Sequence, residues 1–490
     1  MPTLEGDRWA NSDVWERVAW AARFRKAVAW ARDELAEIVH EEVGKPVHEA
    51  LTGDVMPLLM ACRWHERHAA RVLAERRVGG RPLLMMATGA RVCRVALGRV
   101  GVIATWNYPV QLLGIQVLSA LVAGNRVVVK PSERAARSQR RLLELAAGAG
   151  LPAGVLEWTD ATREAGPALL RAGGLDHLVF TGSTAVGREI AALAGGMLLP
   201  TTLELSGCDS ALVLEDADPA LAARSIWNGV VMNAGQTCMA PRRVLVTARV
   251  YERFVYALAP LAAGARPVML IDDAAARKCA DLAASAIEAG GRSVSGVIER
   301  SAGRRMTPVA VVDCPAWAAL VRGEHFGPAL AVVRVADEAA ALAVHRGVAQ
   351  HLSASVFTRD ESRAKRLAVE LGCTQVNIND CVMPTAHPGA SIGGVGSSGW
   401  GLSRGEEGLL AMTRPVFVTR TGKVGRAPTG TVSAKMLGQL SGLMGWWYGG
   451  RKQGEPAAKS GVPGIVEVAT EEAGRGEVER SDAHSARAHS

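Results

Sequence analysis

The clearest structural signal in the sequence is a pair of apolar runs, Val100-Gly101-Val102-Ile103-Ala104 and Arg126-Val127-Val128-Val129-Lys130. Residues 109–122, between them, have the length and composition of a helix. A second predicted helix (137–147) and a third apolar run, His177-Leu178-Val179-Phe180, follow. Continuous apolar strands that alternate with helices are typical of a parallel sheet covered on both faces. The sequence therefore predicts an α/β fold with a doubly wound parallel sheet.

Helices are predicted before this sheet in the sequence, and a second α/β unit is predicted after it. Residues 12–78 have the apolar spacing of helices, and residues 78–104 are expected to be extended. A second α/β unit is predicted from about 210 to 407. It contains three apolar runs that are expected to be strands, at 211–214, 244–246 and 330–333.

Composition is that of an ordinary globular protein with a large core. The 490 residues are 49% hydrophobic and 21% charged, with a net charge of +8 at pH 7. The basic residues are scattered, which argues against nucleic-acid binding. A slightly cationic, solvated surface explains the charge, and it would favour acidic partners or membranes.

Eight cysteines without CxxC spacing indicate reduced thiols rather than disulfides or a zinc site. The acidic N-terminus lacks the apolar core of a signal peptide, and no stretch is apolar for long enough to span a bilayer. We expect a cytoplasmic protein. His65 and His68 lie three residues apart on a predicted helix without a third ligand nearby, so we expect surface residues and no metal site.

Cys238 lies among small and polar residues in Asn233-Ala234-Gly235-Gln236-Thr237-Cys238-Met239-Ala240-Pro241. Small neighbours leave room for a substrate, and polar surroundings are expected to lower the thiol pKa and favour the reactive thiolate. The alternative is a small buried cysteine with no chemical role.

Two further residues strengthen the first interpretation. Glu204 is a lone carboxylate between apolar residues, which suggests a buried strand end and a raised pKa suited to a general base. Asn107 is an amide in an aromatic-rich turn that could donate to an oxyanion. A cysteine, a carboxylate and an amide together indicate acyl chemistry on a carbonyl.

Two segments at predicted strand ends have the chemistry of a dinucleotide site. In Lys130-Pro131-Ser132-Glu133, the carboxylate could accept hydrogen bonds from ribose hydroxyls. The residues alone are equally compatible with a surface ion pair between Lys130 and Glu133. In Thr181-Gly182-Ser183-Thr184-Ala185-Val186-Gly187, a strand runs into a helix whose N-terminus could bind phosphate. Gly394-Val395-Gly396-Ser397-Ser398-Gly399 matches GxGxxG, but a loop precedes it, so we do not predict a nucleotide site there.

The ordered set of motifs resembles the aldehyde dehydrogenase superfamily, and the similarity runs from about Arg23 to Val418. The segments that carry it are Thr-Trp-Asn-Tyr-Pro at 105–109, Lys-Pro-Ser-Glu at 130–133, Leu-Glu-Leu-Ser-Gly at 203–207 and Asn-Ala-Gly-Gln-Thr-Cys at 233–238. Glu324-His325-Phe326-Gly327-Pro328 also resembles the family's ExFGP segment.

The resemblance implies oxidation of a small-molecule aldehyde, with Cys238 as nucleophile, Asn107 as oxyanion donor and Glu204 as the base that hydrolyses a thioester. It implies NAD as cofactor, with NADP tolerated, and a homodimer or homotetramer. The residues implied for cofactor binding are Trp106, Lys130, Ser132, Glu133, Gly182, Ser183, Gly187, Leu205, Glu324 and Phe326.

The resemblance also implies a division of the chain. A dinucleotide-binding domain is expected at 1–80 and 98–206, and a catalytic domain at 207–408. Residues 81–97 and 409–425 are expected to form a small oligomerisation arm, for which a surface hairpin is the alternative. Residues 426–490 are expected to be an apolar segment followed by a disordered tail.

Within the family, three segments resemble the class 3 and coniferyl-aldehyde branch, whose members oxidise medium- and long-chain or aromatic aldehydes. They are the residues 236–241, 378–380 and 393–396. Departures occur at Ser206-Gly207-Cys208 in place of Gly-Gly-Lys, at Ser391-Ile392 in place of Pro-Phe, and at Arg404 in place of a histidine. The loss of an aromatic at Ile392 leaves the substrate range open.

The segment 436–448 is apolar and ends in Trp446-Trp447-Tyr448, so it could lie in a membrane interface or dock as a helix on the protein surface. Residues 453–490 are expected to be disordered. Alternative functions are a CoA-acylating relative, an NADPH-dependent reductase of acyl thioesters, or a catalytically silent structural homologue.

Overall fold

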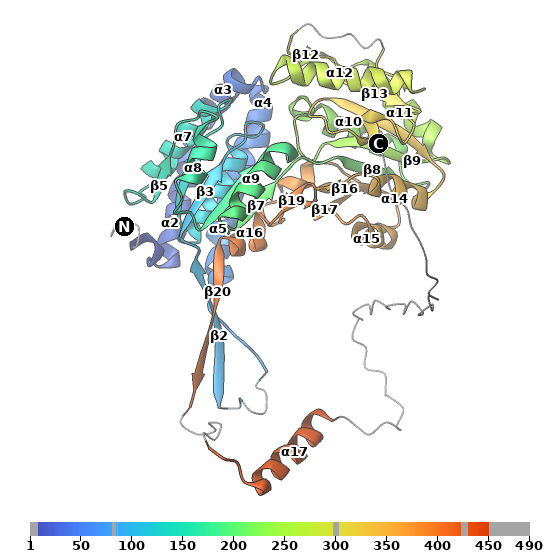
Figure 1. Ribbon diagram of the computed structural model, residues 1–490. Helices are drawn as coiled ribbons and strands as arrows, with labels where there is room; N and C mark the ends of the chain where they lie inside the picture. Colours follow the sequence, from blue (N-terminus) through green and yellow to red (C-terminus); the bar gives the residue numbers. More distant parts are fainter. Residues whose placement is uncertain (1–7, 81–84, 86, 297–302, 423–429, 450–490) are drawn as a thin grey trace, which may run out of the picture. The chain divides into compact units, whose positions relative to one another are not determined.

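The computed structural model describes residues 8–80, 85, 87–296, 303–422 and 430–449 (Figure 1). The chain divides into two compact units, Met1–Thr421 and Gly422–Ser490, and each is described by itself. The expected disorder of residues 453–490 lies outside the described residues.

A six-stranded sheet contains the runs that the sequence marked as strands. Its order is β19-β7-β6-β3-β4-β5, and every pair is parallel except β19 with β7. The strands are β3 (Arg99–Ile103), β4 (Arg126–Lys130), β5 (Leu156–Trp158), β6 (His177–Thr181), β7 (Thr201–Glu204) and β19 (Gly399–Trp400). The helices between them are α6 (Gln111–Val122), α7 (Ala136–Gly148), α8 (Ala165–Arg171) and α9 (Thr184–Gly196).

A second sheet has seven strands in the order β11-β13-β14-β9-β8-β16-β17. They are β8 (Asp209–Val213), β9 (Pro241–Thr247), β11 (Arg292–Ser293), β13 (Val309–Val312), β14 (Ala329–Val335), β16 (Ser353–Phe357) and β17 (Gln375–Ile378). Its helices are α10 (Pro219–Val231), α11 (Tyr251–Ala263), α12 (Asp273–Glu288), α13 (Ala319–Arg322), α14 (Glu338–Arg346) and α15 (Glu361–Glu370). Only β11 pairs antiparallel to its neighbour, so the predicted α/β fold with parallel sheets is confirmed.

A third sheet, β1-β2-β20, joins segments far apart in the sequence. Strand β2 (Thr88–Ala96) pairs antiparallel with β20 (Thr413–Thr421) along its whole length, and β1 (Arg76–Arg77) pairs with the other side of β2. Figure 1 shows β2 and β20 as a long paired ribbon. These two strands belong to the segments expected to form the arm.

The N-terminal helices cover one part of the first core. They are α2 (Val14–Trp30), α3 (Arg32–Val43), α4 (Val47–Glu49), a π-helical turn at Ala50–Val55, and α5 (Met56–Leu73). Trp20 and Phe24 are fully buried and stack with ring centroids 5.5 Å apart. The expectation that His65 lies on the surface is wrong: it is buried, because α5 packs against α6 and its ring lies 3.2 Å from the Ser119 hydroxyl.

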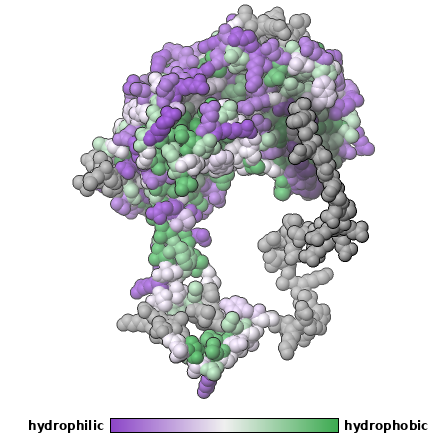
Figure 2. Space-filling view, viewed as in Figure 1, coloured by the Kyte–Doolittle hydropathy of each residue, from purple (hydrophilic) through white to green (hydrophobic). Residues whose placement is uncertain are grey.

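The C-terminal unit contains one described helix, α17 (Ala434–Tyr448). None of its residues is buried, although most of them are apolar, and Figure 2 shows hydrophobic surface on it. No described helix is both long enough and apolar enough to cross a membrane.

Candidate active site

Cys238 lies in a tight loop between α10 and β9. Asn233, Ala234 and Gly235 have φ values of 51°, 53° and 70°, a left-handed conformation that is costly for the two residues with side chains. At Gly235 a Cβ atom would lie 2.4 Å from the backbone carbon of Gly327, so only glycine fits. This close approach brings the nucleophile loop against the ExFGP-like segment.

Arg242 fixes this loop through hydrogen bonds to its backbone. Its guanidinium is buried and donates to the backbone carbonyls of Gly235 (2.8 Å), Thr237 (2.8 Å) and Gly327 (3.0 Å). Three carbonyl acceptors on one planar group fix the loop geometry. This role was not predicted from the sequence, because adjacent arginines are usually surface residues.

The thiol of Cys238 is surrounded by low-dielectric protein, and the expectation of a lowered pKa is wrong for the free enzyme. Burial raises its pKa to about 12, and the carboxylates of Asp209 and Glu204 act in the same direction. The cations of Arg404 and Arg242 oppose the shift. The side chains of Asn233 and Gln236 donate to backbone carbonyls and the Thr237 hydroxyl bonds to Tyr108, so these polar neighbours do not hold a thiolate.

Glu204 ends β7 and is 8% exposed, as the sequence predicted for a buried strand end. Burial raises its pKa, while Ser403, Arg404, Thr181 and others nearby lower it in part. One carboxylate oxygen lies 3.5 Å from the Thr181 hydroxyl, and the other is buried without a hydrogen-bond partner in the described part of the chain. A carboxylate with a free oxygen and a raised pKa can accept a proton from water.

Asn107 lies in the turn between β3 and α6. Its side-chain Nδ2 donates to the Gln236 carbonyl at 3.1 Å, two residues before the nucleophile. One amide hydrogen is therefore used to hold the loop, and the second is free for another acceptor. Asn107, Glu204 and Cys238 line one cavity of about 300 Å³, so the fold brings together the three predicted catalytic residues.

That cavity also contains the residues of the predicted nicotinamide end. Glu324, Phe326, Leu205 and Trp106 line it, and the rings of Trp106 and Phe326 meet edge to face at 5.7 Å. Cys238 also lines a second, more apolar cavity, which shares Glu204, Met239 and Ile392 with the first. A nucleophile between a cofactor-side cavity and a substrate-side cavity can react with a carbonyl while the cofactor is bound.

A larger cleft, of about 610 Å³, continues from the cofactor side. Its lining includes the remaining predicted cofactor residues except Gly187: Lys130, Ser132, Glu133, Gly182 and Ser183. The Lys130 ammonium lies 3.0 Å from the Glu133 carboxylate. Lys130 and Glu133 therefore form an ion pair and also line the cleft, although the sequence presented these two possibilities as alternatives.

Gly187 lies on α9 behind the cleft rather than in its lining. A Cβ atom there would lie 2.4 Å from Leu205 Cδ2, so this glycine allows the helix to pack closely on the sheet. Ser183 caps the same helix by accepting from the Val186 N–H. A helix N-terminus facing a cleft is suited to a pyrophosphate group, so the residues present fit a bound dinucleotide.

The GxGxxG match at 394–399 has a structural role, as its context suggested. Gly399 pairs with Glu204 across β19 and β7, and a Cβ atom on Gly399 would lie 2.1 Å from the Leu203 carbonyl oxygen. The glycine lets an antiparallel strand close the sheet edge beside the catalytic carboxylate.

A buried ion pair that the sequence analysis missed supports the catalytic turn. Lys45 and Asp54 are almost fully buried and paired, with Asp54 supplied by the π-helical turn. The Lys45 ammonium also donates to the Asn107 carbonyl (2.8 Å), and Asp54 accepts the N–H groups of Val110 (3.1 Å) and Gln111 (3.2 Å). In the sequence, Gly44-Lys45-Pro46 signalled only the end of a helix.

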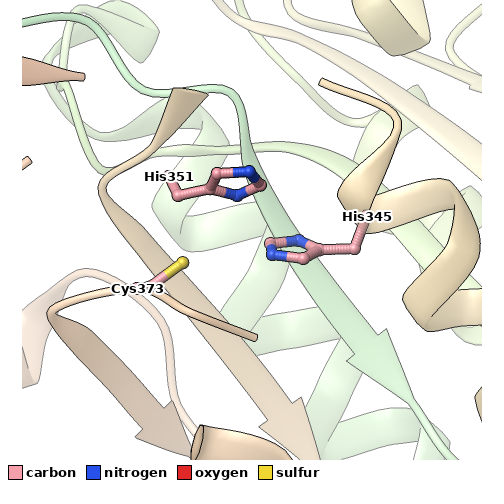
Figure 3. A group of neighbouring side chains, drawn as sticks. All are labelled: His345, His351 and Cys373. Atoms are coloured by element: carbon pink, nitrogen blue, oxygen red, sulfur yellow. The ribbon is translucent and has the colours of Figure 1, made fainter. Parts of the chain in front are cut away.

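One cluster of metal-ligand side chains lies apart from this site. Ligand atoms of His345, His351 and Cys373 are within 4.8 Å of one another, and Figure 3 shows the side chains facing a common point. Both ring nitrogens of His345 already contact other groups, the Ser210 hydroxyl (3.0 Å) and the Leu371 carbonyl (2.9 Å). The cation of Arg243, bonded to the same Ser210 hydroxyl, opposes a metal ion there.

The chain belongs to the aldehyde dehydrogenase family, which it matches over residues 4–418. The 4,4'-diapolycopene aldehyde oxidase of Methylomonas sp. is 32% identical over 450 residues, which cover 90% of this chain and 84% of the relative. The geranial dehydrogenase of Castellaniella defragrans is 33% identical over 422 residues, 83% of this chain and 86% of the relative.

Solved structures agree with this assignment. The Mycobacterium tuberculosis aldehyde dehydrogenase complexed with NAD+ has a TM-score of 0.78 and 29% identity, with 87% of this chain and 88% of that chain covered. The expected family and the expected cofactor class, NAD or NADP, are thus confirmed. The protein is an oxidoreductase of the aldehyde dehydrogenase type.

The Lys45–Asp54 pair yields a stability prediction. Lys45→Met leaves Asp54 as an unpaired buried carboxylate, so we expect the free energy of unfolding to fall by about 3–5 kcal/mol. The Lys45→Met, Asp54→Asn double variant removes both charges and should recover part of the loss. Denaturant unfolding measures both, with Arg71→Met, which breaks the exposed Arg71–Glu406 pair, as a control that changes little. Equal losses in the single and double variants would contradict the buried-charge explanation.

Proposed function

We propose that this protein oxidises an aldehyde to the carboxylic acid through a thioester on Cys238, with water rather than CoA as the acyl acceptor. The observation that carries the proposal is the cavity in which Cys238, Glu204 and Asn107 converge between a cofactor-side and a substrate-side space. Attack on the aldehyde and stabilisation of the oxyanion need a thiol and a hydrogen-bond donor at one carbonyl. Hydrolysis needs a base within reach of the resulting thioester.

In the proposed reaction, the Cys238 sulfur attacks the aldehyde carbon to form a hemithioacetal. The free hydrogen of the Asn107 amide and the Cys238 backbone N–H hold the oxyanion. Bound NAD or NADP supplies the hydride acceptor. Loss of hydride from the substrate carbon leaves a thioester on Cys238. Glu204 then takes a proton from water, which attacks the thioester and releases the acid and the thiolate.

Cofactor preference is proposed from the cleft. The Glu133 carboxylate would repel the 2′-phosphate of NADP, so we propose that NAD is preferred. Lys130, 3.0 Å from Glu133, offsets part of that repulsion and lets NADP bind more weakly. The ratio of kcat/KM for the two cofactors tests this, and a preference for NADP would contradict it.

The substrate-side cavity has a volume of only about 80 Å³, and it is the apolar character of its lining that favours a medium- or long-chain or aromatic aldehyde. Apart from the groups at its catalytic end, most of its lining is apolar: Pro57, Leu112, Met232, Met239, Val382, Met383, Ala386 and Ile392. Methionine side chains adapt their shape to a ligand. The names of two relatives, which refer to diapolycopene aldehyde and geranial, describe apolar aldehydes. We therefore propose that the chain lies near the class 3 and coniferyl-aldehyde branch of the family.

The decisive experiment mixes the purified protein with NAD or NADP and with a short, a long-chain or an aromatic aldehyde. Turnover is measured by the absorbance of the reduced nicotinamide. We expect turnover without CoA, fastest with the long-chain or aromatic aldehyde, and none in Cys238→Ser. Glu204→Gln should form the acyl-enzyme and release it at least about 100-fold more slowly, since it lacks the base. Mass spectrometry of the quenched variant detects the trapped acyl group.

Three results would point elsewhere. Turnover only with CoA favours the CoA-acylating alternative, and reduction of an acyl thioester by NADPH favours the reductase. No reaction in either direction favours a catalytically silent homologue. Normal turnover in Glu204→Gln would remove the base role from Glu204 while leaving the family assignment intact.

The architecture supports proposals about organisation. We propose that residues 1–80 with 98–206 bind the cofactor, that 207–408 supply the catalytic cysteine, and that 81–97 with 409–425 form an arm that contacts a partner subunit. Phe417 and Val418 on β20 are 60% and 47% exposed, which fits a surface covered in a dimer or tetramer. Light scattering measures whether the protein is a homo-oligomer, and a monomer would contradict the proposal.

We propose a cytoplasmic location, since the eight free cysteines are compatible with the reducing cytoplasm.

We further propose that α17 makes a peripheral contact with a membrane. Trp446, Trp447 and Tyr448 are 78%, 50% and 63% exposed at its end, where aromatic rings suit the lipid–water interface. We expect the full chain to sediment with anionic lipid vesicles. Replacement of Leu443, Trp446 and Trp447 by Ser should release it, with Val369→Ser, an 82% exposed apolar residue on α15, as the control. Equal sedimentation of both variants and the parent chain would contradict the proposal.

A further inference from the structure

A buried arginine, Arg404, lies at the catalytic end of the substrate-side cavity. It is 8% exposed and lines this cavity together with Cys238, Glu204 and Tyr108. It precedes α16 (Gly405–Ala411), and both it and Gly405 have positive φ values, 62° and 58°. A Cβ atom on Gly405 would lie 2.5 Å from the Gly389 carbonyl oxygen, so the chain here follows a tightly constrained path.

The guanidinium of Arg404 is not neutralised by a contacting carboxylate. Its Nη1 donates a hydrogen bond to the Thr385 carbonyl at 3.2 Å, and no carboxylate of the described residues lies within ion-pair distance. A buried cation with unused donors normally acquires an anionic partner. The acidic groups that interact with Arg404 through space are Glu204, Cys238 and Tyr108, all of them in the catalytic cavity.

The charges around Cys238 come from several elements. Glu204 on β7 and Asp209 on β8 disfavour a thiolate, whereas Arg404 before α16 and Arg242 on β9 favour it. Tyr108 faces the same space, but its hydroxyl is bonded to the Thr237 hydroxyl at 2.7 Å. Arg242 donates to three backbone carbonyls, and its buried Nε has no partner among the described residues. Of the two cations, Arg404 is the one that lines the substrate-side cavity.

We propose that Arg404 is a positioning residue that stabilises the thiolate of Cys238 and so sets the pH at which the nucleophile becomes available. The inference rests on the proposed function only in taking Cys238 as the nucleophile. The thiol proton passes to water in the cavity, and the positive charge of Arg404 compensates the negative charge left on sulfur. A cation that lines the same low-dielectric cavity acts strongly on such an ionisation.

Alkylation of Cys238 by iodoacetamide tests the proposal without cofactor or aldehyde. The thiolate sulfur forms a bond to the reagent's carbon and iodide leaves, so the rate follows the thiolate fraction. The rate is measured from about pH 6 to about pH 10, with mass spectrometry of the Cys238 peptide to separate it from the other cysteines. All variants are made in a Glu204→Gln background, so that titration of Glu204 does not contribute.

Four variants define the expected pattern. Arg404→Met removes the charge and should slow alkylation at a given pH about tenfold, the effect of raising the thiol pKa by one unit. Arg404→Gln keeps a donor for the Thr385 carbonyl and should show the same shift, so it decides the outcome if Arg404→Met does not fold. Arg404→Lys keeps the charge and should restore most of the rate. Arg253→Met, on the exposed face of α11, is the matched control and should not change it.

An alkylation profile of Arg404→Gln equal to that of the parent would overturn the proposal, and so would a failure of Arg404→Lys to exceed Arg404→Gln. These outcomes are distinct from failure of the proposed function. An enzyme that oxidises aldehydes with an unchanged profile in Arg404→Gln loses this inference alone. A protein without turnover but with the expected shift keeps the electrostatic role of Arg404 and loses the proposed reaction.

Discussion

The buried pair of Lys45 and Asp54 is the interaction on which the catalytic turn depends. Desolvation alone would disfavour both charges, so each one is stable in the interior only because the other is there. The pair anchors the carbonyl of Asn107 and the first N–H groups of α6. The Asn107 amide in turn reaches the Gln236 carbonyl, and Asn233 donates back to the Asn107 carbonyl at 2.9 Å. A chain of hydrogen bonds thereby fixes the nucleophile loop against an element from the other α/β unit.

The catalytic centre combines strong desolvation with a small number of placed charges. Burial raises the pKa of Cys238 to about 12, which favours the neutral thiol, and it also raises the pKa of Glu204, which makes its carboxylate a stronger base. Such a base suits the later step, in which Glu204 must accept a proton from water, but it leaves the thiol in need of a cation. Arg242 and Arg404 supply positive charge from two sides, the first fixed to the backbone of the loop and the second open to the substrate. The same burial therefore creates both the useful base and the difficulty of ionising the nucleophile.

Much of the fold and of the site could be predicted from local sequence. The strands at 99–103, 126–130 and 177–181 follow from apolar runs, because a parallel strand is buried on both faces. Glu204 and its raised pKa followed from one carboxylate among apolar residues. His65 and the pKa of Cys238 were predicted wrongly for one reason: each depends on what packs against the residue from elsewhere in the chain. A polar neighbour in the sequence stabilises a thiolate only if its donors point at the sulfur, and those of Asn233 and Gln236 bond to backbone carbonyls instead.

By itself, the sequence determined the α/β class, the order of the motifs and the candidate reactive groups, since these depend on periodicity and on residue types within a few positions. Only the tertiary structure decided that Lys45 supports Asn107, that Arg242 holds the loop, that Gly399 closes the sheet beside Glu204, and that Arg404 faces Cys238. These contacts join residues separated by 62 to 195 positions or, for Arg242, depend on a loop whose left-handed backbone only its packing can impose. Electrostatic effects follow distance through space and the dielectric between the charges, and neither quantity is encoded in local pattern.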